Sequence, residues 1–144
     1  ELVIAGRVGW KYVSIVERMR SSSRAAEIRF IQNASDAELS AVYAEAELFV
    51  FPSFYEGFGF PPLEAFVAGV PVLSSAAGSL QEVLGEGAEI LDGYDANQWA
   101  SAATAIINDE PRRRLMIDKG RRQASKYTWS ETAKQTMALY RSFG

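Results

Sequence analysis

Two glutamates are separated by seven residues in a segment that otherwise holds mainly glycines, prolines and aromatic side chains. The segment PSFYEGFGFPPLE covers residues 52–64 and contains Glu56 and Glu64. A carboxylate can accept hydrogen bonds from two neighbouring hydroxyl groups, as an acidic residue does with ribose in dinucleotide sites. Sugars supply such pairs of hydroxyl groups. The two positions therefore predict a sugar site, with Glu64 on a ribose and Glu56 on a hexose.

The residues between the two glutamates predict an irregular loop that ends at the start of a helix. Gly57 and Gly59 favour irregular backbone and allow a ligand to approach the main chain closely. Pro61 and Pro62 lack amide protons, so a helix can begin at them but hardly run through them. Glu64 is then expected in the first turn of that helix. Free amides at a helix start form an anion site, which predicts that this loop receives a phosphate group.

Two other interpretations of the glutamates stay open on the residues alone. Glu64 can simply complement the helix dipole, with Glu56 as an incidental charge on a loop. The pair can also be the acid and base of a glycoside hydrolase, although hydrolase carboxylates usually flank an open cleft from opposite sides. The combination of proline, paired glycines, double proline and two spaced glutamates favours the sugar site over both.

The elements that must position this segment follow from apolar runs and helical periodicity. Short apolar runs without polar alternation predict buried strands at residues 2–5, 28–31, 48–51, 70–74 and 88–91. Helical spacing and capping signals predict helices at residues 12–19, 39–46, 96–108, 111–126 and 130–143. Ser35 and Asp36 are good caps for the second helix, with Glu38 close behind. The alternation predicts an α/β fold with a doubly wound, Rossmann-like parallel sheet and a helical C-terminal tail. The loop follows the third strand, at the sheet edge where such folds bind ligands.

The composition excludes several classes of protein. The chain has 144 residues, of which 48% are hydrophobic, so it can bury the core of one ordinary domain. It has no cysteine and no histidine, which are the usual sulfur and nitrogen ligands of zinc and iron, so we expect no metal site. No apolar run approaches the roughly 20 residues of a membrane-spanning helix. Nothing resembles a signal peptide, so we expect a cytoplasmic location.

The charges are distributed unevenly along the chain. Residues 30–111 contain no lysine or arginine but thirteen aspartates and glutamates. This argues against nucleic acid binding by the middle of the chain, because phosphate backbones need clustered cations. A phosphorylated ligand there would need helix termini, chain ends or groups outside the chain to neutralise it. Five arginines near the C-terminus predict a solvated helix face, or else contact with an acidic membrane surface or a partner domain: Arg112, Arg113, Arg114, Arg121 and Arg122.

In the loop at residues 52–64 and the segments around it, the chain resembles family 4, a large family of retaining glycosyltransferases with the two-domain GT-B architecture. PSFYEGFGFPPLEAFVAGVPVLSS is similar to the family's signature. The segments before and after the signature in the family are also similar to this sequence: DAELSAVYAEAELFVFPS resembles the first and GSLQEVLGEGAEILD the second. The likeness covers nearly the whole chain and implies that residues 1–144 form the C-terminal, nucleotide-sugar-binding domain.

The resemblance implies a division of roles at a donor site for a nucleoside diphosphate sugar. Glu56 is implied near the transferred sugar, as the catalytic residue, and the nucleobase is expected near residues 32–34. The implied donor-binding residues are Gly57, Phe58, Gly59, Phe60, Glu64, Asn33 and Ala34. Transfer in such a family is similar to a front-face displacement with retention, in which the leaving diphosphate helps to deprotonate the acceptor. It requires no metal, and we expect no cofactor beyond the sugar nucleotide.

The chain departs from the family's pattern at its start. Gly6, Arg7 and Lys11 superficially imitate the Arg and Lys pair that grips the diphosphate after the first strand. However, Arg7 precedes Glu56 by too few residues. The separation is shorter than in the family's pattern by roughly one βαβ unit of about thirty residues. LVIAGRVGW instead resembles the second strand and its loop. We therefore expect the first strand, the cationic pair and the N-terminal acceptor domain, with its catalytic histidine, to be absent from this chain.

The resemblance implies a retaining hexosyltransferase, with a slight preference for GDP-mannose, that acts on a glycan or lipid-linked acceptor in polysaccharide or glycoconjugate biosynthesis. This chain would supply the donor site and would be inactive alone, because it needs the N-terminal domain or another chain. We expect no nucleic acid partner and no membrane span, with peripheral contact at the inner face of the membrane left open. Two alternatives remain: a non-catalytic binding or assembly module, and a nicotinamide-dependent oxidoreductase, for which the glycine fingerprint after the first strand is missing.

Overall fold

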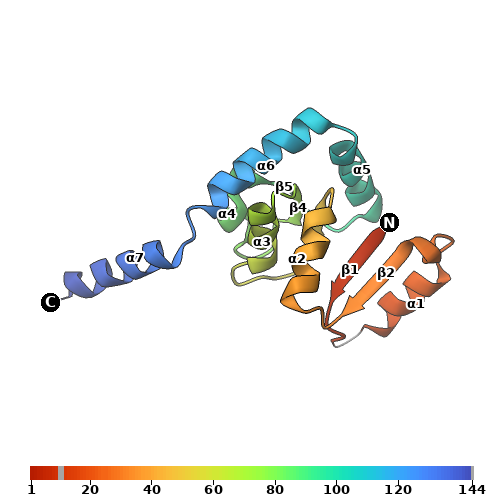
Figure 1. The fold of residues 1–144 in the computed structure, drawn as a ribbon, viewed down its shortest axis with the longest axis horizontal. Helices are drawn as coiled ribbons and strands as arrows, with labels where there is room; N and C mark the ends of the chain where they lie inside the picture. Colours follow the sequence, from red (N-terminus) through yellow and green to blue (C-terminus); the bar gives the residue numbers. More distant parts are fainter. Residues whose placement is uncertain (10–11, 144) are drawn as a thin grey trace. The chain divides into compact units, whose positions relative to one another are not determined.

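The structure is a computed structural model that describes residues 1–9 and 12–143. In this part of the chain, parallel strands alternate with helices (Figure 1). Contacts divide the chain into two units, Glu1–Glu45 and Ala46–Gly144, and each is considered by itself. The elements in chain order are β1 (Leu2–Gly6), α1 (Val13–Ser21), η1 (Ala25–Glu27), β2 (Ile28–Gln32), α2 (Asp36–Glu45), β3 (Phe49–Phe51), α3 (Phe60–Ala68), β4 (Val72–Ser75), α4 (Leu80–Leu84), η2 (Gly85–Gly87), β5 (Ala88–Leu91), α5 (Ala96–Ile107), α6 (Glu110–Ala124) and α7 (Trp129–Ser142).

The first unit is built on a pair of parallel strands. β1 and β2 pair in register, with Leu2 opposite Ile28. α2 begins with the capping box that the sequence predicts. The Ser35 amide donates to a Glu38 carboxylate oxygen at 2.8 Å, and the Glu38 amide donates to the Ser35 hydroxyl at 3.3 Å. These bonds satisfy amides that the start of a helix would otherwise leave without partners.

The second unit contains a three-stranded parallel sheet in the order β3-β4-β5. β4 lies in the middle, with Val72 opposite Phe49 on one side and opposite Ala88 on the other. All four residues of β4 are buried, as expected for a parallel strand without polar alternation. The loops that follow β3, β4 and β5 carry the groups of the candidate site.

Several boundaries differ from the sequence prediction. β4 begins at Val72 rather than at residue 70, because the Val70 amide donates to the Ala65 carbonyl oxygen at 2.9 Å and so belongs to the end of α3. α3 begins at Phe60, before both prolines, so the expectation that Glu64 lies in its first turn is wrong. Glu64 lies in the second turn. α4 was not predicted, because a helix of this length shows no full helical period in the sequence.

In the core of the second unit, α6 packs against α3 and against α5. The ring of Phe66 on α3 is 1% exposed and packs against two glycines. An added Cβ would lie 2.5 Å from this ring at Gly120 of α6 and 2.8 Å from it at Gly87 of η2. α6 can therefore approach α3 only because these positions carry no side chain. A neighbouring buried cluster joins β4 to α5 and α6 and consists of Leu73, Trp99, Ile106 and Met116.

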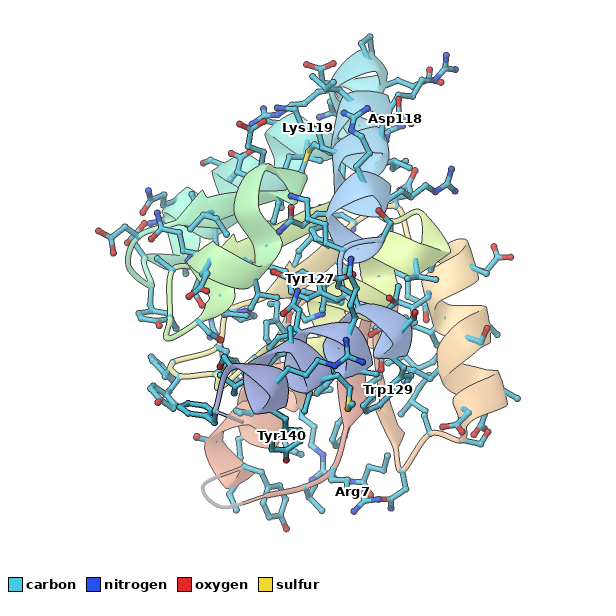
Figure 2. The ribbon with its side chains drawn as sticks, turned by 90° about the vertical axis from the view of Figure 1, so that its left-hand side faces the viewer. Arg7, Asp118, Lys119, Tyr127, Trp129 and Tyr140 are labelled. Carbon is cyan, nitrogen blue, oxygen red and sulfur yellow. The ribbon has the colours of Figure 1, made fainter. Side chains whose placement is uncertain are left out.

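α7 forms the helical tail that the sequence predicts. Its cap is Thr128, whose hydroxyl accepts a hydrogen bond from the Glu131 amide at 3.1 Å. No residue of α7 is buried. Figure 2 labels two aromatic residues on this helix, Trp129 and Tyr140, which are 88% and 69% exposed.

Candidate functional site

The loop between β3 and α3 holds Glu56 in a fixed backbone position. The Glu56 carbonyl oxygen accepts hydrogen bonds from the Ser79 amide at 3.1 Å and from the Ser79 hydroxyl at 3.2 Å. Gly78 has a φ of 59° and lies against the same peptide, where an added Cβ would meet the Glu56 carbonyl oxygen at 2.3 Å. The loop before α4 thus fixes the backbone of the candidate catalytic residue.

The side chain of Glu56 is half-buried and is oriented by Ser53. The Ser53 hydroxyl donates to Glu56 Oε1 at 2.8 Å. The Ser53 carbonyl oxygen in turn accepts from the Ser75 hydroxyl at 2.6 Å and from the Tyr94 hydroxyl at 2.8 Å. One oxygen of the carboxylate is therefore engaged. Within the described residues, Glu56 Oε2 has no hydrogen-bond partner, so it can accept a hydroxyl group of a ligand.

Gly57 and Gly59 are glycine for different physical reasons. Gly59 has a φ of 99°, and an added Cβ would lie 2.5 Å from Leu80 Cδ2, so both its conformation and its packing require glycine. Gly57 does not have a positive φ, and an added Cβ would meet nothing within 4 Å. The backbone at Gly57 therefore faces open space and is accessible to a ligand.

The start of α3 offers fewer amides than an ordinary helix start. Its first four residues are Phe60, Pro61, Pro62 and Leu63, and the two prolines have no amide proton. Leu63 is 7% exposed, so Phe60 supplies the accessible amide of this turn. The helix end itself contributes roughly half a positive charge. The geometry leaves most of the phosphate contacts to the loop amides before the helix and to cations from elsewhere in the protein.

Phe58 packs with Phe60 and with Tyr127, which follows α6. The ring centroids of Phe58 and Phe60 lie 4.9 Å apart, and Tyr127 meets Phe58 edge-on at 5.4 Å. Phe58 is half-buried, whereas Phe60 is 64% exposed. The sequence analysis assigned these two residues to donor binding, and the structure adds that the ring of Phe58 joins the loop to the segment between α6 and α7.

The remaining predicted donor residues divide between the two units. Glu64 follows Phe60 by four positions on α3, so both lie on the same exposed side of this helix. Asn33 and Ala34 follow β2 in the first unit. Asn33 has a φ of 52°, a left-handed conformation that asparagine tolerates better than most residues. The structure thus brings the candidate residues from Glu56 to Glu64 together, while the nucleobase candidates belong to the other unit.

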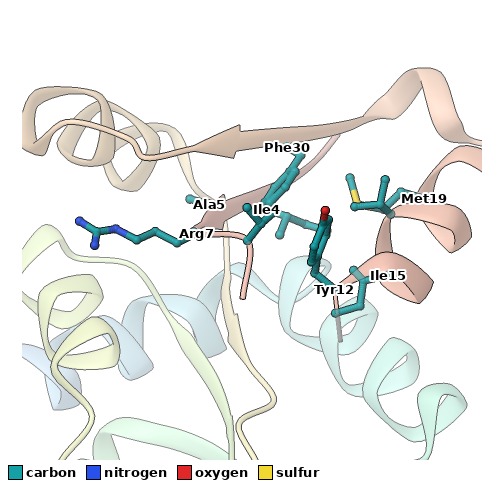
Figure 3. Close-up of a pocket in the computed structure, with 10 residues that line it drawn as sticks. Ile4, Ala5, Arg7, Tyr12, Ile15, Met19 and Phe30 are labelled. Carbon is teal, nitrogen blue, oxygen red and sulfur yellow. The ribbon is translucent and has the colours of Figure 1, made fainter. Parts of the chain in front are cut away.

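A pocket of about 170 Å³ lies between β1 and α1 in the first unit (Figure 3). Arg7 borders it at the end of β1, and in Figure 3 its guanidinium group points away from the other labelled side chains. Lys11, which the sequence comparison considered together with Arg7, lies outside the described residues. The apolar residues labelled around the pocket are Ile4, Ala5, Ile15, Met19 and Phe30, with the ring of Tyr12 among them.

Three of the five C-terminal arginines bind groups of this chain. Arg112 forms a salt bridge with Glu89, and Arg114 forms one with Glu110. The guanidinium group of Arg113 donates to carbonyl oxygens at the end of α5, where the helix dipole favours a cation. These contacts are typical of a solvated helix face that is partly neutralised by its own chain.

Neither a metal cluster nor a membrane-spanning helix is found in residues 1–9 and 12–143. No group of three or more histidine, cysteine, aspartate or glutamate side chains there is placed to hold a metal ion. No helix of the same residues is both long enough and apolar enough to cross a membrane. The groups that the loop does offer are a carboxylate, hydroxyls and backbone amides, which bind hydroxyl-rich and anionic ligands.

Sequence reasoning missed the residues that hold the loop in place. Ser53, Ser75, Gly78 and Ser79 stand in the segments that carry the resemblance, but no role was predicted for them. Their presence in those segments was the available signal. Tyr94 gave no signal, because its hydrogen bond to Ser53 spans 41 positions of the sequence.

Comparison with known proteins places this arrangement in a family. The family described as Glycosyl transferases group 1 matches residues 1–123. The chain belongs to this family. The O-antigen chain mannosyltransferase B of Escherichia coli is 34% identical over 140 residues, which are 97% of this chain and 37% of that protein.

Solved structures similar to this group 1 family member agree on the fold. Sucrose-phosphate synthase from Thermosynechococcus elongatus has a TM-score of 0.79 at 27% identity, over 99% of this chain and 38% of that one. The Anabaena protein HepE, solved in complex with UDP, has a TM-score of 0.80 at 19% identity, over 99% and 40%. The fold is therefore the Rossmann-like C-terminal half of a GT-B glycosyltransferase, followed by a helical tail, as the sequence predicts. The chain spans about two fifths of the length of these proteins.

Proposed function

We propose that this chain forms the donor site of a retaining hexosyltransferase that uses a nucleoside diphosphate sugar. The observation that carries the proposal is the Glu56 loop, in which one carboxylate oxygen is fixed by Ser53 and the other is available to a ligand hydroxyl. Membership of the glycosyl transferases group 1 family supports the same reaction class. The acceptor is a glycan or a lipid-linked sugar.

The groups of the loop divide the donor between them. Glu56 accepts hydrogen bonds from hydroxyls of the transferred hexose, and Glu64 accepts them from the ribose. The phosphates approach the open backbone at Gly57 and the amides of Phe58, Gly59 and Phe60. The nucleobase lies near Asn33 and Ala34. Neither metal nor cofactor has a role in this proposal.

The proposed reaction is a front-face displacement. The bond between the anomeric carbon and the diphosphate oxygen breaks, the acceptor oxygen bonds to the same face, and the acceptor proton passes to the departing diphosphate. Glu56 contributes by holding the hexose in place and by stabilising positive charge that develops on the sugar in the transition state. Retention is tested by determining the anomeric configuration of the product by NMR, and an inverted product would contradict this part of the proposal.

The remainder of the protein supplies what this segment lacks. Residues 30–111 contain no lysine or arginine, so the cations that neutralise a diphosphate come from other parts of the protein or from another chain. The described strands form a two-stranded sheet, β1-β2, in the first unit and a three-stranded sheet, β3-β4-β5, in the second. The acceptor site belongs to an N-terminal domain in this proposal, and the segment alone is inactive.

GDP-mannose is the proposed donor. The similarity to a mannosyltransferase of Escherichia coli supports mannose as the sugar. UDP-glucose is the natural competitor to test, because HepE was solved with UDP and shares the fold. Both sugars present neighbouring hydroxyls to Glu56, so the choice depends on the nucleobase residues and on the wall of the hexose pocket.

Location follows from the reaction and from the surface charge. We propose that the protein acts in the cytoplasm, with peripheral contact between the α6 arginines and an acidic membrane surface. Sedimentation of the full-length protein with vesicles of anionic lipid, compared with vesicles of neutral lipid, tests the contact. Equal sedimentation with both would contradict it.

The deciding experiment is a calorimetric titration of the full-length protein with GDP-mannose, UDP-glucose, GDP and UDP, with reduced nicotinamide dinucleotide as the control. We expect one of the two nucleotide sugars to bind more tightly than both ligands that carry the other base. No heat from any nucleoside diphosphate would contradict the proposal. Donor binding without transfer to any glycan or lipid-linked acceptor would instead favour a binding or assembly module.

A further inference from the structure

Ser53 is bonded at both of its polar ends. Its hydroxyl donates to Glu56 Oε1 at 2.8 Å, and its carbonyl oxygen accepts from the Ser75 hydroxyl at 2.6 Å and the Tyr94 hydroxyl at 2.8 Å. Ser75 ends β4 and is 1% exposed, and Tyr94 lies in the loop after β5. The end of β4 and the loop after β5 therefore fix the residue that orients the Glu56 carboxylate.

The hydroxyl of Ser53 has a single proton, so it serves one acceptor at a time. Its two acceptors in reach are Glu56 Oε1 at 2.8 Å and the Tyr55 carbonyl oxygen at 3.2 Å. The shorter bond to a charged oxygen is the stronger one. Both acceptors are reached from one position of the Ser53 Oγ, and the two donors to the Ser53 carbonyl oxygen help to hold the backbone that sets this position.

We propose that Ser53 and Tyr94 are positioning residues for the Glu56 carboxylate, with Tyr94 holding Ser53 so that its hydroxyl stays within hydrogen-bond distance of Glu56 Oε1. This inference rests on the proposed function, because it assigns to both residues an effect on transfer of the hexose. Neither side chain touches the donor. Their effect on the rate passes through the Glu56 carboxylate.

Tyr94 is suited to this role because its ring is held independently of its hydroxyl. The ring contacts Phe54 with 4.4 Å between the centroids, while the hydroxyl reaches the Ser53 carbonyl oxygen. Tyr94→Phe therefore keeps the ring contact and removes only the hydrogen bond. Ser75→Ala would change a residue buried in the centre of the sheet, so its effects on folding and on the site would be difficult to separate.

The experiment measures turnover and donor KM in the full-length enzyme for Tyr94→Phe, Ser53→Ala and Ser53→Thr. Tyr55→Phe is the matched control, because it removes a phenol hydroxyl from the loop that carries Ser53. This hydroxyl makes no hydrogen bond among the described residues. We expect kcat to fall about 100-fold in Ser53→Ala, the scale of a small misplacement of a catalytic group. Tyr94→Phe should lose about tenfold, and Ser53→Thr, which keeps a hydroxyl, should recover most of the rate. The affinity for the nucleoside diphosphate without its sugar should change less than twofold, since the proposed diphosphate contacts do not include Glu56.

A double-mutant cycle with Glu56→Ala separates positioning from a purely structural role. If Tyr94 acts through the Glu56 carboxylate, Tyr94→Phe costs no further rate once that carboxylate is removed. Equal turnover in Tyr94→Phe and Tyr55→Phe, or an undiminished loss in the Glu56→Ala background, would overturn the inference while leaving the proposed function intact. A near-native rate of Glu56→Ala would overturn both.

Discussion

The carbonyl oxygen of Glu56 accepts both the amide and the hydroxyl hydrogen of Ser79, at 3.1 and 3.2 Å. Ser79 stands immediately before α4, 23 positions away along the sequence. The loop after β4 therefore shapes the loop after β3, and substitutions in either one are expected to affect Glu56.

Gly78→Ala should destabilise the protein and displace Glu56. Its φ of 59° disfavours any other residue, and a Cβ would lie 2.3 Å from the Glu56 carbonyl oxygen. We expect the free energy of unfolding to fall by about 1 to 3 kcal/mol, as for other strained backbone positions. Chemical denaturation measures this loss, and turnover of the folded fraction measures the displacement. Unchanged stability together with unchanged turnover would contradict the packing described here.

Gly57→Ala should have the opposite profile. Its backbone has no positive φ and its Cβ would enter open space, so stability should change by less than about 0.5 kcal/mol. Donor affinity should fall about tenfold or more, roughly 1.4 kcal/mol, because the new methyl group occupies the space through which the phosphates approach. Calorimetric titration with the donor checks it. Gly59→Ala is the comparison, since it should lose stability through its clash with Leu80.

Glu56→Ala should reduce turnover strongly, by about 2 to 4 kcal/mol of transition-state stabilisation if the contact resembles other preorganised electrostatic contacts. Glu64→Ala should mainly raise donor KM, because its ribose contact is the same in the ground state and the transition state. Steady-state kinetics of the full-length enzyme separates the two effects. Glu82→Ala, which removes an exposed carboxylate from α4, serves as the control and should behave as wild type. A rate for Glu56→Ala close to that of the control would refute the assignment.

Gly120→Ala tests the packing of α6 on α3. Alanine in a helix interior is ordinarily better than glycine by about 1 kcal/mol. Here the new Cβ would lie 2.5 Å from Phe66 Cδ1, so overpacking should reverse the sign and cost about 1 to 3 kcal/mol. Thermal and chemical unfolding measure the change, with Arg122→Ala on an exposed position of the same helix as the control. A higher free energy of unfolding for Gly120→Ala would show that α6 can shift away from α3 at little cost.

Ser35→Ala should raise the pKa of the Glu38 carboxyl toward its ordinary value. The hydroxyl and the backbone amide of Ser35 hold that pKa below its ordinary value, with the hydroxyl as the larger cause. Because the folded-state pKa is the lower one, the stabilisation is present above the unfolded-state pKa and is lost as the pH falls through the folded-state value. An NMR titration of the Glu38 carboxyl checks the shift. Ser40→Ala on the same helix is the control, and an equal pKa in both variants would exclude the capping box as the cause.

The parts of the fold that the sequence predicts are those encoded by neighbouring residues. The strand Ala88–Leu91 and the cap formed by Ser35 and Glu38 depend on patterns within a few positions, so they could be located without a structure. The loop at residues 52–59 could also be predicted, because glycine and proline restrict the backbone locally. Glu64 was misplaced by one turn, since prolines are tolerated at the second and third positions of a helix as well as at its first.

The support of the candidate site could not be predicted in this way. Ser75 and Tyr94 donate hydrogen bonds to Ser53 from 22 and 41 positions away in the sequence, and no local sequence pattern predicts such a bond. Gly78 looks like any loop glycine until the Glu56 peptide is seen beside it. Serine in a loop is also common for local reasons such as turns and caps. The chemistry of the loop could therefore be predicted from its own residues. Its rigidity comes from residues that are distant in the sequence and that only the fold places beside the loop.

The contact of Phe66 with Gly87 and Gly120 has an evolutionary consequence. A side chain at either glycine has no room while the ring of Phe66 remains, so no one of these three positions can change in size freely. Relatives that carry a larger residue at position 87 or 120 should carry a smaller one at position 66. These positions should therefore covary across the family, although they lie on α3, η2 and α6 and none of them belongs to the candidate site.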